Sequence, residues 1–149
     1  MGAPLNVLFL CTGNSARSIL AEALANHPAV GGGRLRGHSA GSHPRGQVHP
    51  LAIDTLRERG HPTGGLRSKC WDEFAAPAAP QMDVIVTVCD HAAAEPCPLW
   101  PGRPATEHWG MPDPAAVEGS DDDRRRAFRE TYDALRRRMA DFATAARPV

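Results

Sequence analysis

The residues best suited to chemistry in this chain lie close together near its N-terminus, in the order Cys11-Thr12-Gly13-Asn14-Ser15-Ala16-Arg17-Ser18. An apolar run precedes Cys11 and a helical pattern follows Ser18, so this segment is expected to turn from a strand into a helix. In such a turn successive backbone N–H groups converge on one point, and the helix N-terminus adds partial positive charge. The spacing therefore predicts a site for a tetrahedral oxyanion with a thiol inside it.

The side chains of this loop fit an oxyanion and a nucleophile. Arg17 can hold two oxyanion oxygens through parallel hydrogen bonds, and Gly13 and Asn14 tolerate the left-handed backbone angles of a tight loop. The loop dipoles favour the reactive thiolate of Cys11, and Ser18 is placed to donate a hydrogen bond to its sulfur. We predict Cys11 as the nucleophile and an anion-binding loop of Thr12, Gly13, Asn14, Ser15, Ala16, Arg17 and Ser18. The alternative interpretation is a structural cysteine in a turn.

Strands and helices alternate around this loop. Residues 6–10 form a continuous apolar run, typical of a buried strand in a parallel sheet, and residues 83–88 form the clearest strand, rich in β-branched side chains. Shorter strands are expected at residues 35–40 and 105–109. Besides the helix after the loop, helices are expected at residues 50–59, 72–74 and 120–146. The pattern predicts one α/β domain, residues 1–149, with a parallel sheet.

Composition limits the classes of partner. Seventeen basic and seventeen acidic residues give a formal net charge of zero, whereas a nucleic-acid-binding protein usually has a basic excess. No run approaches the roughly 20 apolar residues of a membrane span, and no basic stretch precedes the apolar run at residues 7–10, as a signal peptide would require. We therefore expect a cytoplasmic protein that binds neither nucleic acid nor membrane. Among its four cysteines, thiols for catalysis or metal binding are expected rather than structural disulfides.

Three motifs resemble one family. The loop at residues 11–18, the Ser39-Ala40-Gly41 after the second strand, and Asp113-Pro114 are similar to those of the low-molecular-weight protein tyrosine phosphatase superfamily, which includes thiol-dependent arsenate reductases. The resemblance covers nearly the whole chain. It implies a three-layer sandwich, with a central four-stranded parallel sheet flanked by helices. It also implies that Asp113 is the general acid that protonates the leaving oxygen, whereas the residues alone would make it an ordinary loop acid.

The resemblance also favours the reductase branch. Reductases of this family carry a thiol relay on a Val-Thr-x-Cys strand end followed by a Cys-Pro, and the matching residues here are Cys89 and Cys97. The stretch Glu107-His108-Trp109-Gly110 is also similar to that branch. Phosphatases of this fold usually have aromatic residues after the Asp-Pro pair, where this chain has Ala115 and Ala116. The resemblance thus implies reduction of arsenate to arsenite through a Cys11–arsenate adduct.

The expected relay places geometric demands on the chain. Cys89 attacks Cys11, and Cys97 then attacks Cys89. Disulfide Cα atoms lie roughly 5.5 Å apart, but eight residues of intact helix span about 12 Å. Residues 90–96 are therefore expected to loop back, and to refold during turnover.

Other interpretations stay open at this stage. The second is a phosphotyrosine phosphatase or phosphomonoesterase, and the third is a non-catalytic or thiol-based regulatory binder of oxyanions. A zinc site at Cys89, His91, Cys97 and His108 lacks a two-residue cysteine pair, so no metal is predicted, and Cys70 is expected to pack as a small hydrophobe near Trp71.

The expected ligands and partners follow from the leading hypothesis. Arsenate is the expected substrate, with phosphate and sulfate as competing anions. No bound cofactor is expected; the electrons come from an external thiol reductant, which is thioredoxin, glutaredoxin with glutathione, or another small thiol. Some reductases of the family hold a potassium ion partly through an acidic residue before the third strand. Residues 67–71 lack that acid, which argues against potassium dependence.

Overall fold

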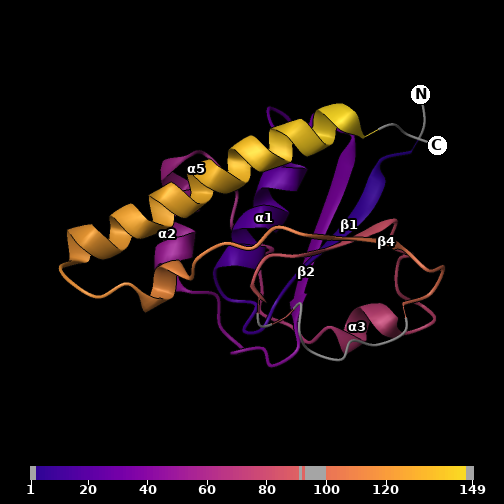
Figure 1. The fold of residues 1–149 in the computed structure, drawn as a ribbon, viewed down its shortest axis with the longest axis horizontal. Helices are drawn as coiled ribbons and strands as arrows, with labels where there is room; N and C mark the ends of the chain where they lie inside the picture. The colour runs from indigo at the N-terminus through magenta and orange to yellow at the C-terminus, as the bar shows by residue number, and fades with distance from the viewer. Residues whose placement is uncertain (1–2, 91, 93–99, 147–149) are drawn as a thin grey trace.

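The computed structural model describes residues 3–90, 92 and 100–146 and places a four-stranded parallel sheet between helices (Figure 1). In spatial order the strands are β2 (Leu35–Gly41), β1 (Leu5–Cys11), β3 (Val84–Thr87) and β4 (Ala105–His108). The helices are α1 (Arg17–Asn26), α2 (Pro50–Glu58), α3 (Asp72–Ala75), the short 3₁₀ helix η1 (Pro114–Ala116) and α5 (Asp121–Ala145). The predicted α/β class and the four predicted strands are confirmed, with β3 shorter than expected.

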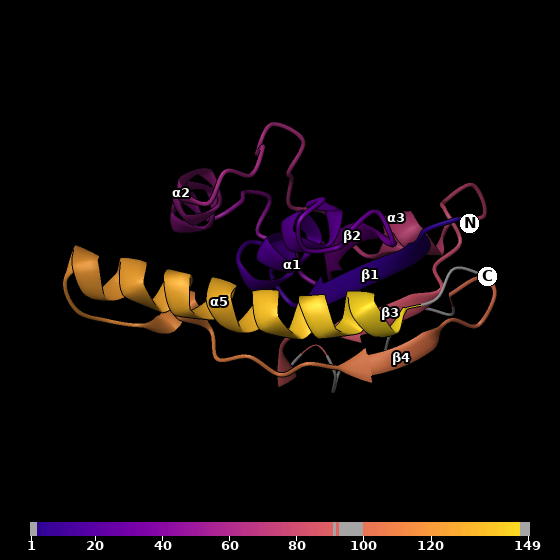
Figure 2. The same ribbon diagram turned by 90° about the horizontal axis from the view of Figure 1, so that it is seen from above.

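Two apolar layers cover the two faces of the sheet. Because successive side chains of a strand point to opposite faces, Val7 and Phe9 of β1 pack with α1, α2 and α5, whereas Leu8 and Leu10 pack with Phe74 of α3. Figure 2 shows α5 running along the sheet, and Figure 1 shows α3 on the side away from α5. The molecule is therefore the expected three-layer sandwich.

The parallel register brings the ends of three strands to one edge of the sheet. Cys11 at the end of β1 pairs with Gly41 at the end of β2. On the other side, Leu10 pairs with Thr87 at the end of β3, two residues before Cys89. In open parallel sheets, ligands bind outside the carboxyl ends of the strands. The fold thus places the predicted loop and the second thiol at the edge where sites form.

Helix α5 begins with a capping box. The Ser120 hydroxyl accepts from the backbone N–H of Asp123, and the Asp123 carboxylate accepts from the backbone N–H of Ser120. This satisfies two of the free donors at the helix start.

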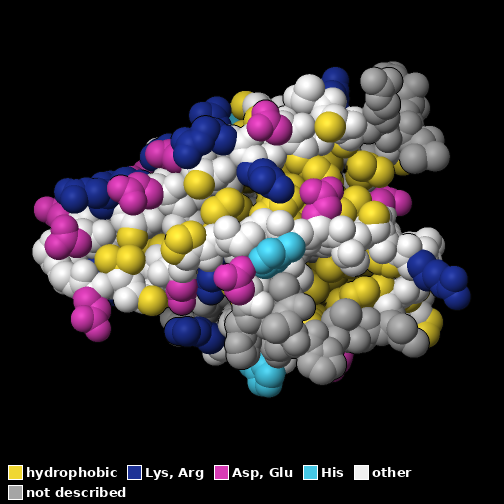
Figure 3. Space-filling view, viewed as in Figure 1, with side chains coloured by type: hydrophobic (Ala, Val, Ile, Leu, Met, Phe, Trp, Pro, Cys, Tyr) yellow, Lys and Arg dark blue, Asp and Glu magenta, His cyan; other side chains and the backbone are white. Residues whose placement is uncertain are grey.

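Helix α5 carries two runs of arginine, residues 124–126 and 136–138. Basic and acidic side chains are interspersed on this part of the surface (Figure 3), and Arg125 and Arg129 pair with acids of α2. The arrangement is that of a solvated surface of mixed charge.

Within the described ranges, none of the helices combines the length and the apolar character that crossing a membrane requires.

His49 caps helix α2 in a way that should make stability depend on pH. Its Nδ1 accepts a hydrogen bond from the backbone N–H of Leu51, which only an unprotonated nitrogen can do. Partial burial, followed by the charges of Arg124 and Arg45, lowers the pKa of His49 below its ordinary value of 6.5. The unfolded chain therefore binds the proton first, so the contribution of His49 is complete above pH 6.5 and is lost as pH falls through the folded-state pKa.

We expect the melting temperature to fall on acidification below pH 6.5, and to fall less in His49→Asn. Asparagine retains a cap acceptor but does not titrate in this range. Burial also lowers the pKa values of His38 and His61, so the difference between wild type and variant isolates His49. Identical pH slopes in thermal unfolding would contradict this role.

Candidate active site

The loop after β1 turns its carbonyl groups outward. The carbonyl oxygens of Thr12, Gly13 and Ser15 accept hydrogen bonds from the backbone N–H groups of residues 43, 45 and 49, each at 2.9 Å. Because C=O and N–H point in opposite directions across a trans peptide, the N–H groups of the same peptides point to the enclosed side of the loop. The loop therefore has the donor arrangement that an oxyanion needs.

Close approach of β2 to the loop requires a glycine. A Cβ atom on Gly41 would lie 2.5 Å from the carbonyl oxygen of Thr12 and 2.9 Å from that of Cys11. The positive φ of Asn14, 44°, provides the tight bend. The left-handed conformation expected at Gly13 or Asn14 is found at Asn14 and not at Gly13, whereas Gly41 is needed for its lack of a side chain.

The Cys11 sulfur receives a hydrogen bond from a fixed hydroxyl. Cys11 Sγ lies 2.9 Å from Ser18 Oγ, and the Asn14 Nδ2 group donates to Ser18 Oγ at 2.8 Å. Since the amide of Asn14 can only donate there, the Ser18 hydroxyl proton is available to Cys11 Sγ. All three residues are buried. This arrangement fixes the position of the sulfur at the base of the loop.

Arg17 and Asp113 meet on the open side of the loop. One guanidinium nitrogen of Arg17 donates to the carbonyl oxygen of Met111 at 2.9 Å, and another lies 3.8 Å from Asp113 Oδ2. Asp113 Oδ1 accepts from the backbone N–H of Ala115 at 2.9 Å, which caps the short helix η1. The remaining donors of Arg17 and the second oxygen of Asp113 can therefore face a ligand together.

Cys89 lies next to the loop. Its sulfur is 3.7 Å from the Thr12 hydroxyl and accepts a contact of 3.4 Å from the backbone N–H of Ala92. Its side chain is buried. The second thiol thus contacts the residue that directly follows the first one in the chain.

A single pocket of about 520 Å³ contains these groups. Its lining includes both thiols, the Arg17–Asp113 pair and a second arginine, Arg45. Among the described residues that line it there is no Phe, Tyr or Trp. The full lining is Cys11, Thr12, Gly13, Ser15, Ala16, Arg17, His43, Arg45, Cys89, Asp90, Met111, Pro112, Asp113 and Ala115. The pocket is suited to a small anion that two arginines attract.

The comparison with known proteins agrees with this geometry. The sequence model of a family described as low molecular weight phosphotyrosine protein phosphatase matches residues 6–147. The chain belongs to this family. It is 36% identical over 137 residues to an arsenate reductase of Halalkalibacterium halodurans, which covers 92% of this chain and 94% of that protein.

Solved structures of the family share the fold. An arsenate reductase in the oxidised state superposes with a TM-score of 0.73 at 26% identity, covering 95% of this chain and 98% of that one. A thioredoxin-dependent arsenate reductase of Corynebacterium glutamicum superposes with a TM-score of 0.66 at 24% identity, covering 98% of this chain and 64% of that one. The low-molecular-weight phosphatase fold inferred from the sequence is therefore confirmed.

Most of the site residues that we predicted for this chain line the pocket. Cys11, Arg17, Cys89 and Asp113 line it together with most of the loop, whereas Asn14 and Ser18 lie buried behind the loop and hold Cys11. Cys97 lies outside the described residues, as does His91. The role of Cys97 in the relay therefore remains a prediction, and the zinc site that includes both residues remains untested.

Two further histidines, His108 and His38, have local partners. His108 Nδ1 lies 2.7 Å from the Thr87 hydroxyl, and its Nε2 lies 2.8 Å from Asp90 Oδ1. His38 lies 3.2 Å from Asn6 Oδ1 and contacts the ring of Phe74. Among the described residues, no three His, Cys, Asp or Glu side chains form a metal-sized cluster.

The sequence did not predict three parts of the site. The amide of Asn14 links the loop to Ser18, Arg45 lines the pocket from the segment before α2, and Lys69 lies buried behind the loop. No sequence pattern indicated that Arg45 lines the pocket, because its position depends on how residues 43–49 wrap around the loop. For Lys69 the composition contained an indication, because it is the only lysine among seventeen basic residues.

Proposed function

We propose that this protein reduces arsenate to arsenite, with Cys11 as the nucleophile. The observation that carries the proposal is the second thiol, Cys89, in the same anion pocket. A phosphatase of this family needs one thiol, because water completes its reaction. A reductase needs a further thiol to take up the oxidation. The arsenate reductases among the relatives support this choice.

The first step is attack of the Cys11 thiolate on arsenic. The loop N–H groups and Arg17 stabilise the negative charge that develops on the arsenate oxygens. A sulfur–arsenic bond forms and an arsenic–oxygen bond breaks, so that one hydroxyl of hydrogen arsenate leaves as water with the proton that Asp113 supplies. The Ser18 hydroxyl holds the attacking sulfur, since it lies 2.9 Å from Cys11 Sγ. The product is a Cys11–arsenate adduct in which arsenic is still pentavalent.

The second step uses Cys89. Its thiolate attacks Cys11 Sγ, so that a disulfide forms and the sulfur–arsenic bond breaks. The electron pair of that bond stays on arsenic, which leaves as trivalent arsenite. Two thiols are thereby oxidised to a disulfide, and arsenate takes up two electrons. The 3.7 Å contact between Cys89 Sγ and the Thr12 hydroxyl supports attack from this side of the loop.

The third step regenerates the nucleophile. In our proposal Cys97 attacks Cys89, which frees Cys11 and leaves a Cys89–Cys97 disulfide. An external thiol of the thioredoxin or glutaredoxin and glutathione kind, or another small thiol, then reduces this disulfide. Such a cycle requires a reducing compartment, in keeping with a cytoplasmic protein.

Counting thiols tests this proposal directly. The protein is fully reduced, the reductant is removed, and excess arsenate is added. We expect two thiols to disappear per arsenite released, with a Cys89–Cys97 bridge found by peptide mapping. No thiol loss and no arsenite would contradict the internal relay. Adding glutathione then separates a reductase that borrows a thiol from a phosphatase.

The second candidate function is hydrolysis of a phosphomonoester. The family and the anion loop favour it, because arsenate and phosphate have the same shape and charge. The pocket favours an inorganic anion, because Ala115 stands where a phosphotyrosine cleft would need an aromatic ring. Hydrolysis of an aryl phosphate faster than arsenate reduction would reverse the order of the two functions.

A further inference from the structure

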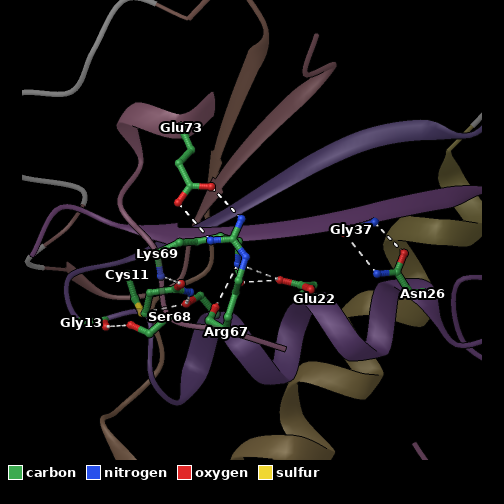
Figure 4. Close-up of polar contacts among 12 residues, drawn as sticks. Cys11, Gly13, Glu22, Asn26, Gly37, Arg67, Ser68, Lys69 and Glu73 are labelled. Carbon is green, nitrogen blue, oxygen red and sulfur yellow. Dashed lines mark hydrogen bonds and ion pairs between the residues drawn. The ribbon is translucent and has the colours of Figure 1, made fainter. Parts of the chain in front are cut away.

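Lys69 is a buried cation directly behind the active-site loop (Figure 4). Its ammonium group lies 3.5 Å from Glu22 Oε1 of α1 and 3.4 Å from the Ser39 hydroxyl of β2. It also donates to the carbonyl oxygen of Arg67 at 3.1 Å. Only 8% of Lys69 is exposed, so its charge has been taken out of water for these contacts.

The main chain around Lys69 holds the loop. The backbone N–H of Lys69 donates to Asn14 Oδ1 at 2.9 Å, and the neighbouring Ser68 hydroxyl donates to the carbonyl oxygen of Gly13 at 3.2 Å. The other end of the Asn14 amide holds the Ser18 hydroxyl that contacts Cys11 Sγ. A continuous chain of hydrogen bonds therefore runs from the backbone of Lys69 to the nucleophile.

Glu22 makes a cation necessary at this place. Its carboxylate accepts from Ser39 Oγ at 2.5 Å and is 15% exposed. A buried carboxylate without a counter-ion is strongly destabilising. Glu22 follows Ser18 by four residues on α1, about 6 Å along the helix, so its charge would also repel an anion in the loop. Burial lowers the pKa of Lys69, and the Glu22 carboxylate acts in the opposite direction, favouring the ammonium form. Arg67 is engaged elsewhere, with Glu73.

The residue type fits this interpretation. The chain has sixteen arginines and one lysine, and that lysine stands where the cation is buried. An ammonium is a compact charge with three donors, whereas a guanidinium is planar and larger. Three nearby oxygens, from Glu22, Ser39 and Arg67, surround the ammonium. The site therefore suits a small cation.

We propose that Lys69 is a positioning residue of the reaction, an internal cation that neutralises Glu22 and holds the segment that orders Asn14. Its loss exposes the bound oxyanion to the Glu22 charge and loosens the Asn14–Ser18–Cys11 chain. The inference rests on the proposed function only in taking Cys11 as the nucleophile. Arsenate reduction itself is not needed to test it.

The test measures oxyanion binding without turnover. Iodoacetamide alkylates Cys11, which is the only cysteine in the tryptic peptide that ends at Arg17, and inorganic phosphate in the loop protects it. For Lys69→Ala we expect the protecting phosphate concentration to rise about tenfold, the order expected for one uncompensated charge roughly 10 Å away in a protein. Alkylation without phosphate should also become slower.

Two comparisons separate the cation from mere packing. Ammonium chloride should restore much of the phosphate protection to Lys69→Ala, whereas tetramethylammonium chloride at equal ionic strength, which is bulky and lacks N–H donors, should not. The double variant Lys69→Met with Glu22→Gln removes both charges, and should bind phosphate more tightly than Lys69→Met alone. The double variant has no lone buried carboxylate, so it can be measured even if Lys69→Met does not fold. In that case its affinity for phosphate should be close to that of the wild type.

The outcomes are distinct. Wild-type phosphate protection in folded Lys69→Ala would overturn the proposal, as would equal effects of the two salts. A double variant as weak as Lys69→Met would also overturn it, because the charge of Glu22 would then be irrelevant. If the proposed reductase activity fails in the wild type while these binding results hold, the positioning role stands and only the reaction is wrong.

Discussion

Cys11→Ser is expected to abolish arsenite formation, by at least about 10³-fold, and to leave oxyanion binding in place. The loss of a nucleophile removes the covalent route altogether. The serine hydroxyl is similar in size and can still contact Ser18, and Arg17 with the loop N–H groups is unchanged. Arsenite release in a single turnover and phosphate binding by calorimetry measure the two properties separately.

Cys70→Ser is the matched control. Cys70 is a partly buried thiol beside Gly41, outside the pocket lining. This variant should release as much arsenite as wild type. Arsenite formed by Cys11→Ser at more than a trace would show that another thiol attacks arsenate, and loss of activity in Cys70→Ser would place Cys70 in the relay.

The conformation of the loop was predictable because the residue types that produce it are adjacent in the chain. A nucleophile, a flexible pair and an arginine between a strand and a helix leave few arrangements, and the structure has the one expected. The strand end at Cys89 was predictable for a related reason. Parallel strands bring their carboxyl ends to one edge, so Cys89 had to lie near Cys11 once β1 and β3 were recognised.

The end of β4 shows where local pattern stops being sufficient. The sequence suggested a strand through Trp109, but β4 ends at His108. Trp109 still donates its backbone N–H to Thr87, yet its ring packs against Phe9 and Phe142. Burial of a large ring between β1 and α5 decides this position, and that contact joins residues far apart in the chain.

The contacts that support the loop could not be predicted from the sequence, because they also join residues far apart in the chain. Asn14 meets Lys69 across 55 residues, and Arg17 meets Met111 across 94. No periodicity encodes such contacts. They depend on the segments after β2 and β4 folding back over the loop. What the sequence does carry is their residue types, such as a lone lysine among arginines.

Cys89→Ser is expected to stop arsenite release at the second step rather than the first. Cys11 is untouched, so arsenate should still bind and form the adduct. Without the second thiol nothing in the pocket attacks Cys11 Sγ, and arsenite release should fall at least about 10²-fold. Arsenite released in a single turnover without added thiol measures the loss. A small thiol added in excess should restore part of the activity, since it can replace Cys89.

Cys97→Ser distinguishes the second thiol from the third. It retains Cys11 and Cys89, so it should release one arsenite per molecule and stop as a Cys11–Cys89 disulfide. Full turnover of Cys97→Ser with every reductant tested would remove Cys97 from the relay. Wild-type arsenite release by Cys89→Ser in a single turnover would remove Cys89 from the relay, because another thiol of the chain would then take up the oxidation. Absence of arsenite release from the wild type, together with hydrolysis of an aryl phosphate, would instead indicate a phosphatase, since a single thiol in an anion loop suffices for hydrolysis but not for a two-electron reduction.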